Sequence, residues 1–337
     1  MTNPSEDVQA LRNPIVVAAF EGWNDAADAA TDALRFLIRS LHAKEVFELD
    51  AQEYSDYQSA RPHVALSNGV VTGIQWRTTT ISIAKVAGAD HDLILIIGIE
   101  PNLKWLQFCE EILSFAAVHN ATTVITLGAL LGDAPHTRPL PVTGTASDPD
   151  TIAKLGLQRS RYEGPTGIVG VLSDAARRSG FEAISLWVPV PHYTANAPSP
   201  KATLILLQRL ASLFQLPIEL SSLAAAARGW EVTVNSMVET DGDLTAYVHQ
   251  LEARFDSDGE LGDDPIDIDI DPDPLFDTEY FDEIDGFFSD EDDAEEEDDD
   301  DEDDDDIFDE DDLPSGDSLA QDFERYLRDQ RPDDSSP

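Results

Sequence analysis

Residues able to do chemistry gather behind the carboxyl ends of four predicted strands. Two imidazoles and a carboxylate can bind a metal or transfer protons, and a guanidinium can hold an anionic group. Open α/β sheets bind ligands at this edge, so we expect these side chains to line one crevice or one interface. The candidate residues are Trp23, Asp25, Glu100, His136, Arg138 and His192.

A purely structural role for these residues stays open. Turns after strands are rich in Gly, Pro, Asn and Asp for conformational reasons, and a histidine beside a proline is more often structural than a ligand. The chain contains no phosphate-binding loop, dinucleotide-binding fingerprint or nucleophile elbow. We therefore assign no catalytic residue, no metal and no cofactor from the sequence.

The candidate residues require a set of strands to position them. Short β-branched runs alternate with segments of helical period, which is typical of an α/β fold with a mainly parallel sheet. Two of the runs lack polar alternation, so we expect them to be central strands covered on both faces. The predicted strands are 15–20, 46–49, 93–99, 123–127 and 183–188.

The predicted helices have readable ends. One helix follows Asn24 and Asp25, which can cap it, and another follows Ser199 and Pro200. A helix after Asn102 carries Cys109 on its apolar stripe, so we expect a buried structural thiol. Two further helices, 221–239 and 244–254, cover either the sheet or another subunit. The glycine-rich run 164–170 favours close backbone packing over an anion loop.

Two extended segments in the first third of the chain are predicted to pair with each other. Residues 70–76 and 79–86 are separated by almost nothing. We expect them to form an antiparallel hairpin inserted at the edge of the sheet.

The net charge of −47 comes mostly from one end of the chain. Up to residue 254 there are 28 acidic and 18 basic residues; from residue 255 onward there are 40 and 3. This balance disfavours binding to nucleic acids and to anionic membranes. The longest strongly apolar run, 93–99, is too short to span a bilayer, and the polar N-terminus is unlike a signal peptide. We expect a cytoplasmic protein.

The sequence predicts three parts. Residues 1–255 form an α/β/α domain, and residues 256–313 form an acidic, aromatic-dotted segment that we expect to be disordered. Residues 314–337 contain a short amphipathic helix with a capping box at Ser318. The apolar face of that helix is expected to bind a partner. It consists of Leu319, Phe323, Tyr326 and Leu327.

Several motifs in the same order resemble the actinobacterial branch of the proteasome assembly chaperone 2 family. The resemblance covers residues 14–255, and segment 313–328 is similar to the tail of those proteins. The motifs are Phe20–Ala26, Gly98–Pro101, Leu127–Pro139, Gly144–Ser147, Arg161–Gly170, Val190–Tyr193 and Ser199–Ala202.

The resemblance implies a three-layer α/β/α fold similar to the phosphorylase/hydrolase class, self-assembly, and an association with 20S proteasomes. The family has no agreed catalytic residues, so the resemblance assigns none. Archaeal relatives that engage proteasomes carry a hydrophobic-Tyr-any residue ending, whereas this sequence ends in Asp-Asp-Ser-Ser-Pro337. Docking into proteasome α-ring pockets by such an ending is therefore not expected.

Two functions are consistent with the sequence as hypotheses. The first is a non-catalytic oligomeric chaperone or scaffold that acts on proteasome α-subunits, with a trimer expected from fold analogy. The alternative is a hydrolase or phosphorylase-like enzyme with a pocket at the strand ends. The alternative requires His136 and His192 to lie within reach of Glu100.

Overall fold

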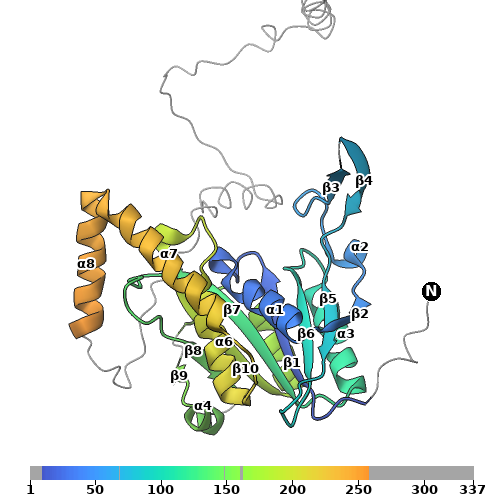
Figure 1. Cartoon of the computed structure of the whole chain (residues 1–337). Coiled ribbons are helices and arrows are strands. Elements are labelled where there is room, and N and C mark those ends of the chain that lie inside the picture. Colours follow the sequence, from blue (N-terminus) through green and yellow to red (C-terminus); the bar gives the residue numbers. More distant parts are fainter. Residues whose placement is uncertain (1–9, 68, 148, 160–161, 258–337) are drawn as a thin grey trace, which may run out of the picture. The chain divides into compact units, whose positions relative to one another are not determined.

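The computed structural model describes residues 10–257, apart from residues 68, 148 and 160–161. The predictions for the acidic segment, except its first two residues, and for the terminal helix with Leu319, Phe323, Tyr326 and Leu327 lie outside the described residues. Figure 1 labels the helices and strands that the described residues form.

A twisted sheet runs through the centre of the described chain (Figure 1). Its strands are β1 (Ile15–Glu21), β2 (Lys44–Glu48), β5 (Thr80–Ala84), β6 (Leu93–Ile99), β7 (Thr123–Gly132), β8 (Thr143–Ala146), β9 (Gln158–Arg159) and β10 (Glu182–Pro191). Among the described residues these eight strands lie in the order β2-β5-β6-β1-β7-β10-β8-β9. The four central strands β6, β1, β7 and β10 are mutually parallel, so their carboxyl ends share one edge.

On each side of the four parallel strands, the next strand pairs antiparallel to its neighbour. β5 runs antiparallel to β6, and β8 runs antiparallel to β10. β7 is longer than predicted because its pairing with β10 continues in register from Thr123 to Gly132. The extra residues carry the strand as far as the loop that holds His136.

Helices cover both faces of the sheet, which confirms the predicted α/β/α layers. The helices are α1 (Ala29–Ser40), α2 (Ala51–Tyr54), α3 (Trp105–Val118), α4 (Pro149–Leu155), α5 (Ile168–Arg178), α6 (Pro200–Phe214), α7 (Ser221–Glu239) and α8 (Gly242–Ser257), with 3₁₀ turns η1 (Ala26–Asp28) and η2 (His192–Thr194). α1 and α6 pack on one face, and α3 and α5 pack on the other.

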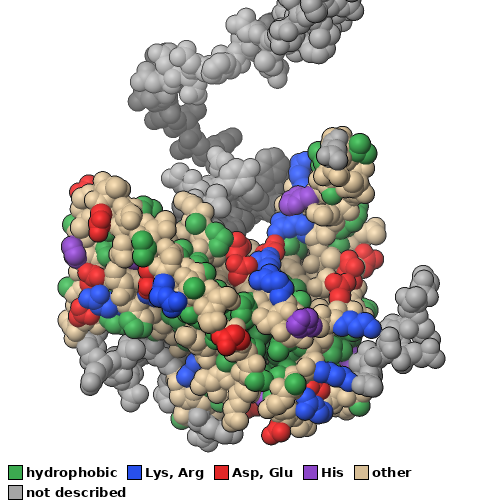
Figure 2. Space-filling view, viewed as in Figure 1, with side chains coloured by type: hydrophobic (Ala, Val, Ile, Leu, Met, Phe, Trp, Pro, Cys, Tyr) green, Lys and Arg blue, Asp and Glu red, His purple; other side chains and the backbone are tan. Residues whose placement is uncertain are grey.

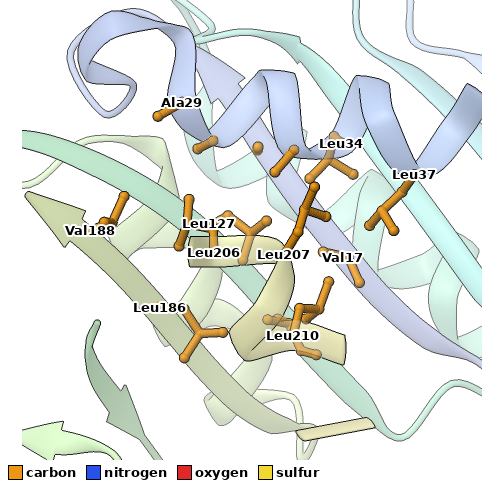
Figure 3. Close-up of a cluster of buried hydrophobic side chains, with 14 of the residues drawn as sticks. Val17, Ala29, Leu34, Leu37, Leu127, Leu186, Val188, Leu206, Leu207 and Leu210 are labelled. Atoms are coloured by element: carbon orange, nitrogen blue, oxygen red, sulfur yellow. The ribbon is translucent and has the colours of Figure 1, made fainter. Parts of the chain in front are cut away.

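The central strands feed both cores because their side chains alternate between the faces. In β1, Val17 and Ala19 join the core under α1 and α6, whereas Val16 and Ala18 join the core under α3 and α5. Figure 3 shows side chains of α1 and α6 pointing towards those of β1, β7 and β10. A strand buried on both faces needs no polar alternation, as the sequence predicted.

Cys109 lies in the second core and is 1% exposed. Burial raises the pKa of its thiol to about 12. The prediction of a buried structural thiol is therefore confirmed.

The predicted pairing of segments 70–76 and 79–86 is wrong. β5 leaves this neighbourhood and enters the main sheet between β2 and β6. The other segment, β4 (Val70–Gln75), instead pairs with β3 (His63–Ser67) as a separate two-stranded sheet. The buried β6 edge offers β5 a better partner than β4 does, because β5 has apolar side chains such as Ile81 that the core covers.

The last two helices pack on the body through a small cluster of their own. Val234 and Val238 of α7 contact Val248 of α8, with Tyr193 and Trp230 around them. No helix among the described residues combines the length and apolarity needed to cross a bilayer.

Leu207 tests the first core. It is fully buried on α6 (Figure 3), so Leu207→Ala should lower the free energy of unfolding by about 2–5 kcal/mol through lost burial and a cavity. Urea denaturation measures the loss. Leu204→Ala on the same helix is the control, because Leu204 is only partly buried and should cost less. Equal losses would contradict the packing described.

Candidate functional site

The carboxylate of Glu100 joins three loops at the carboxyl edge of the sheet. Glu100 follows β6, and its Oε1 accepts a hydrogen bond of 2.7 Å from the Asn24 side chain, in the loop after β1. The same oxygen accepts a bond of 2.7 Å from the backbone N–H of Ile168, the first residue of α5. A carboxylate is favourable there because the amino end of a helix carries a partial positive charge.

Gly167 allows these three loops to meet. A Cβ at this position would lie 2.4 Å from both the Asn24 Nδ2 and the Glu100 Oε1. Any other residue would therefore require the side chain of Asn24 or Glu100 to shift and would disturb their contact. The glycine-rich run before α5 thus serves close packing, as the sequence favoured, and Glu100 holds the position that an anion would take.

The loops held by Glu100 and the first turn of α3 carry exposed apolar side chains. Trp23 is 42% exposed, Leu103 47%, Leu106 79% and Tyr162 44%. We call these four residues the carboxyl-edge rim. Large exposed apolar side chains that follow strand ends at one edge of the sheet make that edge a candidate contact surface.

Asp25 lies beneath this rim and supports α1. It is 6% exposed, and its carboxylate accepts hydrogen bonds from the backbone N–H of Ala30, at 2.6 Å, and from the backbone and hydroxyl of Thr31. The turn between them is strained, because Ala27 and Asp28 have φ values of 52° and 54°. Burial raises the pKa of Asp25 to about 6.

His136 is fully buried with both ring nitrogens engaged. Its Nδ1 faces the Tyr193 hydroxyl at 2.9 Å, and its Nε2 faces the Asn235 Oδ1 at 3.0 Å. A neutral ring satisfies both contacts, with Nε2–H donating to Asn235 and the Tyr193 hydroxyl donating to Nδ1. Burial lowers the pKa of His136, which agrees with that state.

The backbone of His136 is held as well. The buried Lys201 donates from Nζ to the His136 carbonyl at 2.5 Å and forms an ion pair of 2.6 Å with Glu231. These contacts tie the loop after β7 to α6 and α7. His136 therefore serves as a structural link in this arrangement.

Arg138 and His192 face α8 and its neighbours. Arg138 makes a two-bond contact with Asp256, at 2.9 and 2.7 Å, and a third bond of 3.1 Å with Glu252. The carboxylate of Asp256 raises the pKa of Arg138. His192 lies 3.9 Å from Asp133, which accepts a hydrogen bond from Tyr247 of α8.

The predicted residues thus divide into three groups. Trp23 belongs to the rim and Glu100 holds its loops, Asp25 holds α1, and the remaining three link the loops after β7 and β10 to the last helices. No hydrogen bond or ion pair joins Glu100 to His136 or His192, and the described residues contain no metal-binding cluster. Because both ring nitrogens of His136 are engaged, that residue has no free nitrogen with which to share a ligand with His192.

An open depression of about 340 Å³ lies on the α1 side of the sheet. Glu21, Arg35 and Thr80 are among the residues that line it, and Glu21 is bound there by Arg35 and Arg77. None of the six candidate residues lines this depression. Glu21 ends β1 and Gly98 lies near the end of β6, so the depression is at the carboxyl edge but is built from other residues than the predicted ones.

Sequence reasoning missed several residues that organise the site. Asn24 and Gly167 lie within conspicuous motifs, but only the fold reveals that they touch the same oxygen. Tyr193 follows the candidate His192 directly. Asn235 sits in the middle of a helix, where no sequence signal distinguishes it from a solvated side chain.

Comparison with known proteins gives consistent matches. The model of the PAC2 family matches residues 19–238. The structure is similar to that of a PAC2 family protein from Streptomyces avermitilis, with 47% identity and a TM-score of 0.65, over 70% of this chain and 99% of that one. The search of the curated proteins gives no match.

Two further solved structures are similar. One is the proteasome-assembly chaperone homologue Rv2125 of Mycobacterium tuberculosis, at 44% identity and a TM-score of 0.65, over 69% of this chain and 99% of that one. The other is PbaB of Pyrococcus furiosus, an archaeal proteasome activator, at 18% identity and a TM-score of 0.55, over 68% and 96%. The second likeness shows the fold alone.

The raised pKa of Asp25 predicts a pH dependence of stability. An acid with a higher pKa in the folded protein stabilises it fully below the ordinary value of 3.8, and this contribution is lost as the pH rises through about 6. Two pKa units correspond to about 3 kcal/mol. Asp25→Asn should remove this decline between pH 4 and 7, measured as the free energy of unfolding against pH.

Asp28→Asn is the matched control for Asp25. Asp28 is exposed, and asparagine tolerates the left-handed backbone found there. The control should keep most of the slope of the parent protein, because the charge of Asp28 is the smallest of the causes that shift the pKa of Asp25. A slope that is unchanged in Asp25→Asn would refute the role given to its burial.

Glu100→Ala should loosen the rim. The mutation leaves the Ile168 N–H and the Asn24 amide without their acceptor, which should cost about 1–3 kcal/mol. Hydrogen exchange of residues 21–25 and 165–170 should accelerate. Glu100→Gln retains an acceptor and should recover part of the stability, whereas Glu110→Ala on the exposed side of α3 should change neither measurement. Unchanged hydrogen exchange in Glu100→Ala would contradict the role of Glu100 in holding the three loops together.

Proposed function

Because this chain belongs to the PAC2 family, we propose that it is a non-catalytic assembly chaperone or scaffold that acts on 20S proteasome subunits. The proteasome link comes from the relative at 44% identity, which is described as a proteasome-assembly chaperone homologue. The match covers 99% of that relative's structure, so nearly every part of the relative has a counterpart in this chain.

The carboxyl-edge rim is the observation that carries this proposal. Enzymes of open α/β folds place polar reacting groups at this edge. Here Glu100, Asp25 and His136 are occupied by backbone or side-chain partners, and the exposed positions include four large apolar side chains. An edge with engaged polar groups and exposed aromatic and aliphatic side chains is suited to binding a protein surface.

The charge distribution supports capture of a cationic partner. Residues 255–337 contain 40 acidic and 3 basic side chains. Such a segment raises association rates with a basic surface and makes binding sensitive to salt. We propose that this segment recruits proteasome α-subunits, with Leu319, Phe323, Tyr326 and Leu327 as apolar contacts.

The scaffold is proposed to be a homo-oligomer, with three copies as the expected number, and to work in the cytoplasm. The rim supports self-association because it leaves apolar area exposed on a single copy. No cofactor belongs to this function.

Capture of purified proteasome α-subunits tests the function. The full chain should bind them at low salt, and binding should fall steeply towards 1 M salt, where the screening length is only about 3 Å. A chain ending at residue 257 should bind much more weakly, because it lacks the acidic segment. Surface plasmon resonance measures both effects, with a basic protein of unrelated fold as the control. Failure of the full chain to bind α-subunits at low salt would refute the proposal.

A further inference from the structure

The sheet formed by β3 and β4 carries one wholly apolar face. Val64 lies opposite Ile74, and Leu66 lies opposite Val71. Opposed residues of an antiparallel pair share a face, and Val64 and Leu66 share one because they are two residues apart. We call Val64, Leu66, Val71 and Ile74 the hairpin face.

The hairpin face is uncovered. Its four side chains are between 51% and 61% exposed, although all of them are large aliphatic groups. Figure 1 shows β3 and β4 projecting away from the main sheet, and Figure 2 shows hydrophobic side chains on the surface there. A two-stranded sheet is marginally stable in water unless its apolar face packs against something. We therefore expect another surface to pack on the hairpin face.

The base of the hairpin is fixed, so it is presented in a defined direction. Trp76, just after β4, packs against Tyr57 with ring centroids 4.9 Å apart and the ring planes tilted by 56°. Arg77 then forms an ion pair of 2.5 Å with Glu21 at the end of β1. A contact made by this hairpin loses little freedom on binding, because its root is already ordered.

Charge indicates what covers the hairpin. The chain has a net charge of −47, yet no Asp, Glu, Lys or Arg occurs between Arg61 and Arg77. Two copies of so acidic a chain repel except where charges are absent or opposite. The hairpin is such a place, and the exposed Arg61 at its start adds a positive charge.

The rim supplies the complementary surface. It is apolar at Trp23, Leu103, Leu106 and Tyr162, and the exposed acidic residues Glu110 and Glu163 are close to them in the sequence. The exposed Lys104 between Leu103 and Leu106 is ion-paired with Glu53, so the charge near the rim is negative on balance. Apolar side chains would meet apolar side chains, and Arg61 would meet carboxylates. Within one copy both surfaces remain open, so the hairpin does not cover its own rim.

We propose that the hairpin face of one copy packs on the carboxyl-edge rim of a second copy of this chain. This inference rests on the self-association in the proposed function and names its surfaces. The contact joins two different surfaces, so successive copies form a closed ring when the rotation between them permits, as a trimer does.

Charge placed on the hairpin face tests this contact. Leu66→Asp with Val71→Asp should convert the full-length oligomer into monomers in analytical ultracentrifugation, while the melting temperature of the monomer stays unchanged because these positions are exposed. Ser67→Asp, on the opposite face of the same strand, is the matched control and should preserve the oligomer. An oligomer that survives the double mutation would overturn the proposal, as would a parent chain that is monomeric throughout.

Disulfide trapping identifies the two surfaces. Leu66→Cys chains mixed with Leu106→Cys chains and oxidised with diamide should form a cross-linked pair of the two chain types, since two thiols are oxidised to one disulfide as diamide is reduced. The native Cys109 is buried and should not react. Val232→Cys, which is 65% exposed on α7, replaces Leu106→Cys in the control and should give no such pair.

The outcomes separate this inference from the proposed function. Cross-linking of Leu66→Cys only to itself would show that hairpins meet each other and would overturn the rim as their partner. A monomeric chain that still captures proteasome α-subunits would overturn the self-contact and leave the proposed function standing. Trapping of Leu66→Cys with Leu106→Cys, without capture of α-subunits, would support the contact and refute the proteasome role.

Discussion

Glu100 accepts hydrogen bonds from Asn24 and from the first N–H of α5, and the carboxyl edge of the sheet depends on these two contacts. They fasten the loop after β1, the loop after β6 and the amino end of α5 to one oxygen atom. The carboxylate satisfies a helix end that would otherwise lack an acceptor. Gly167 suits this contact because a Cβ there would crowd the ends of the Asn24 and Glu100 side chains. The apolar rim is therefore presented on a fixed base.

The other polar residues at this edge also act as connectors. Asp25 binds the start of α1, His136 binds Tyr193 and Asn235, and Arg138 binds two carboxylates of α8. Each of these groups resembles a catalytic residue in type, but its capacity for hydrogen bonding is used inside the protein. A buried polar group with satisfied partners stabilises a specific arrangement, whereas an unsatisfied one costs free energy. This edge is consequently suited to contact rather than to chemistry.

An extreme net charge and a charge-free hairpin occur in the same chain, and the two features fit together. Repulsion between acidic copies opposes random association, so self-contact is restricted to the few surfaces that lack negative charge. The hairpin face and the rim are both apolar, and they differ in the charges beside them. An oligomer built from these surfaces would leave the acidic segments free to meet a basic partner. Such a division of roles is expected of a scaffold.

The sequence by itself determined the layers of the fold, because the runs 93–99 and 123–127 without polar alternation require cover on both faces, and β6 and β7 have it. It also determined that the candidate residues follow strand ends. Only the tertiary structure decided that β5 enters the main sheet and leaves β4 to pair with β3, since strand partners are chosen by long-range burial. The partners of Glu100 and His136 were likewise hidden, because Ile168 and Asn235 lie 68 and 99 residues away along the chain. Local patterns fix which segments are strands or helices, whereas contacts between distant segments fix whether a polar side chain is free to react.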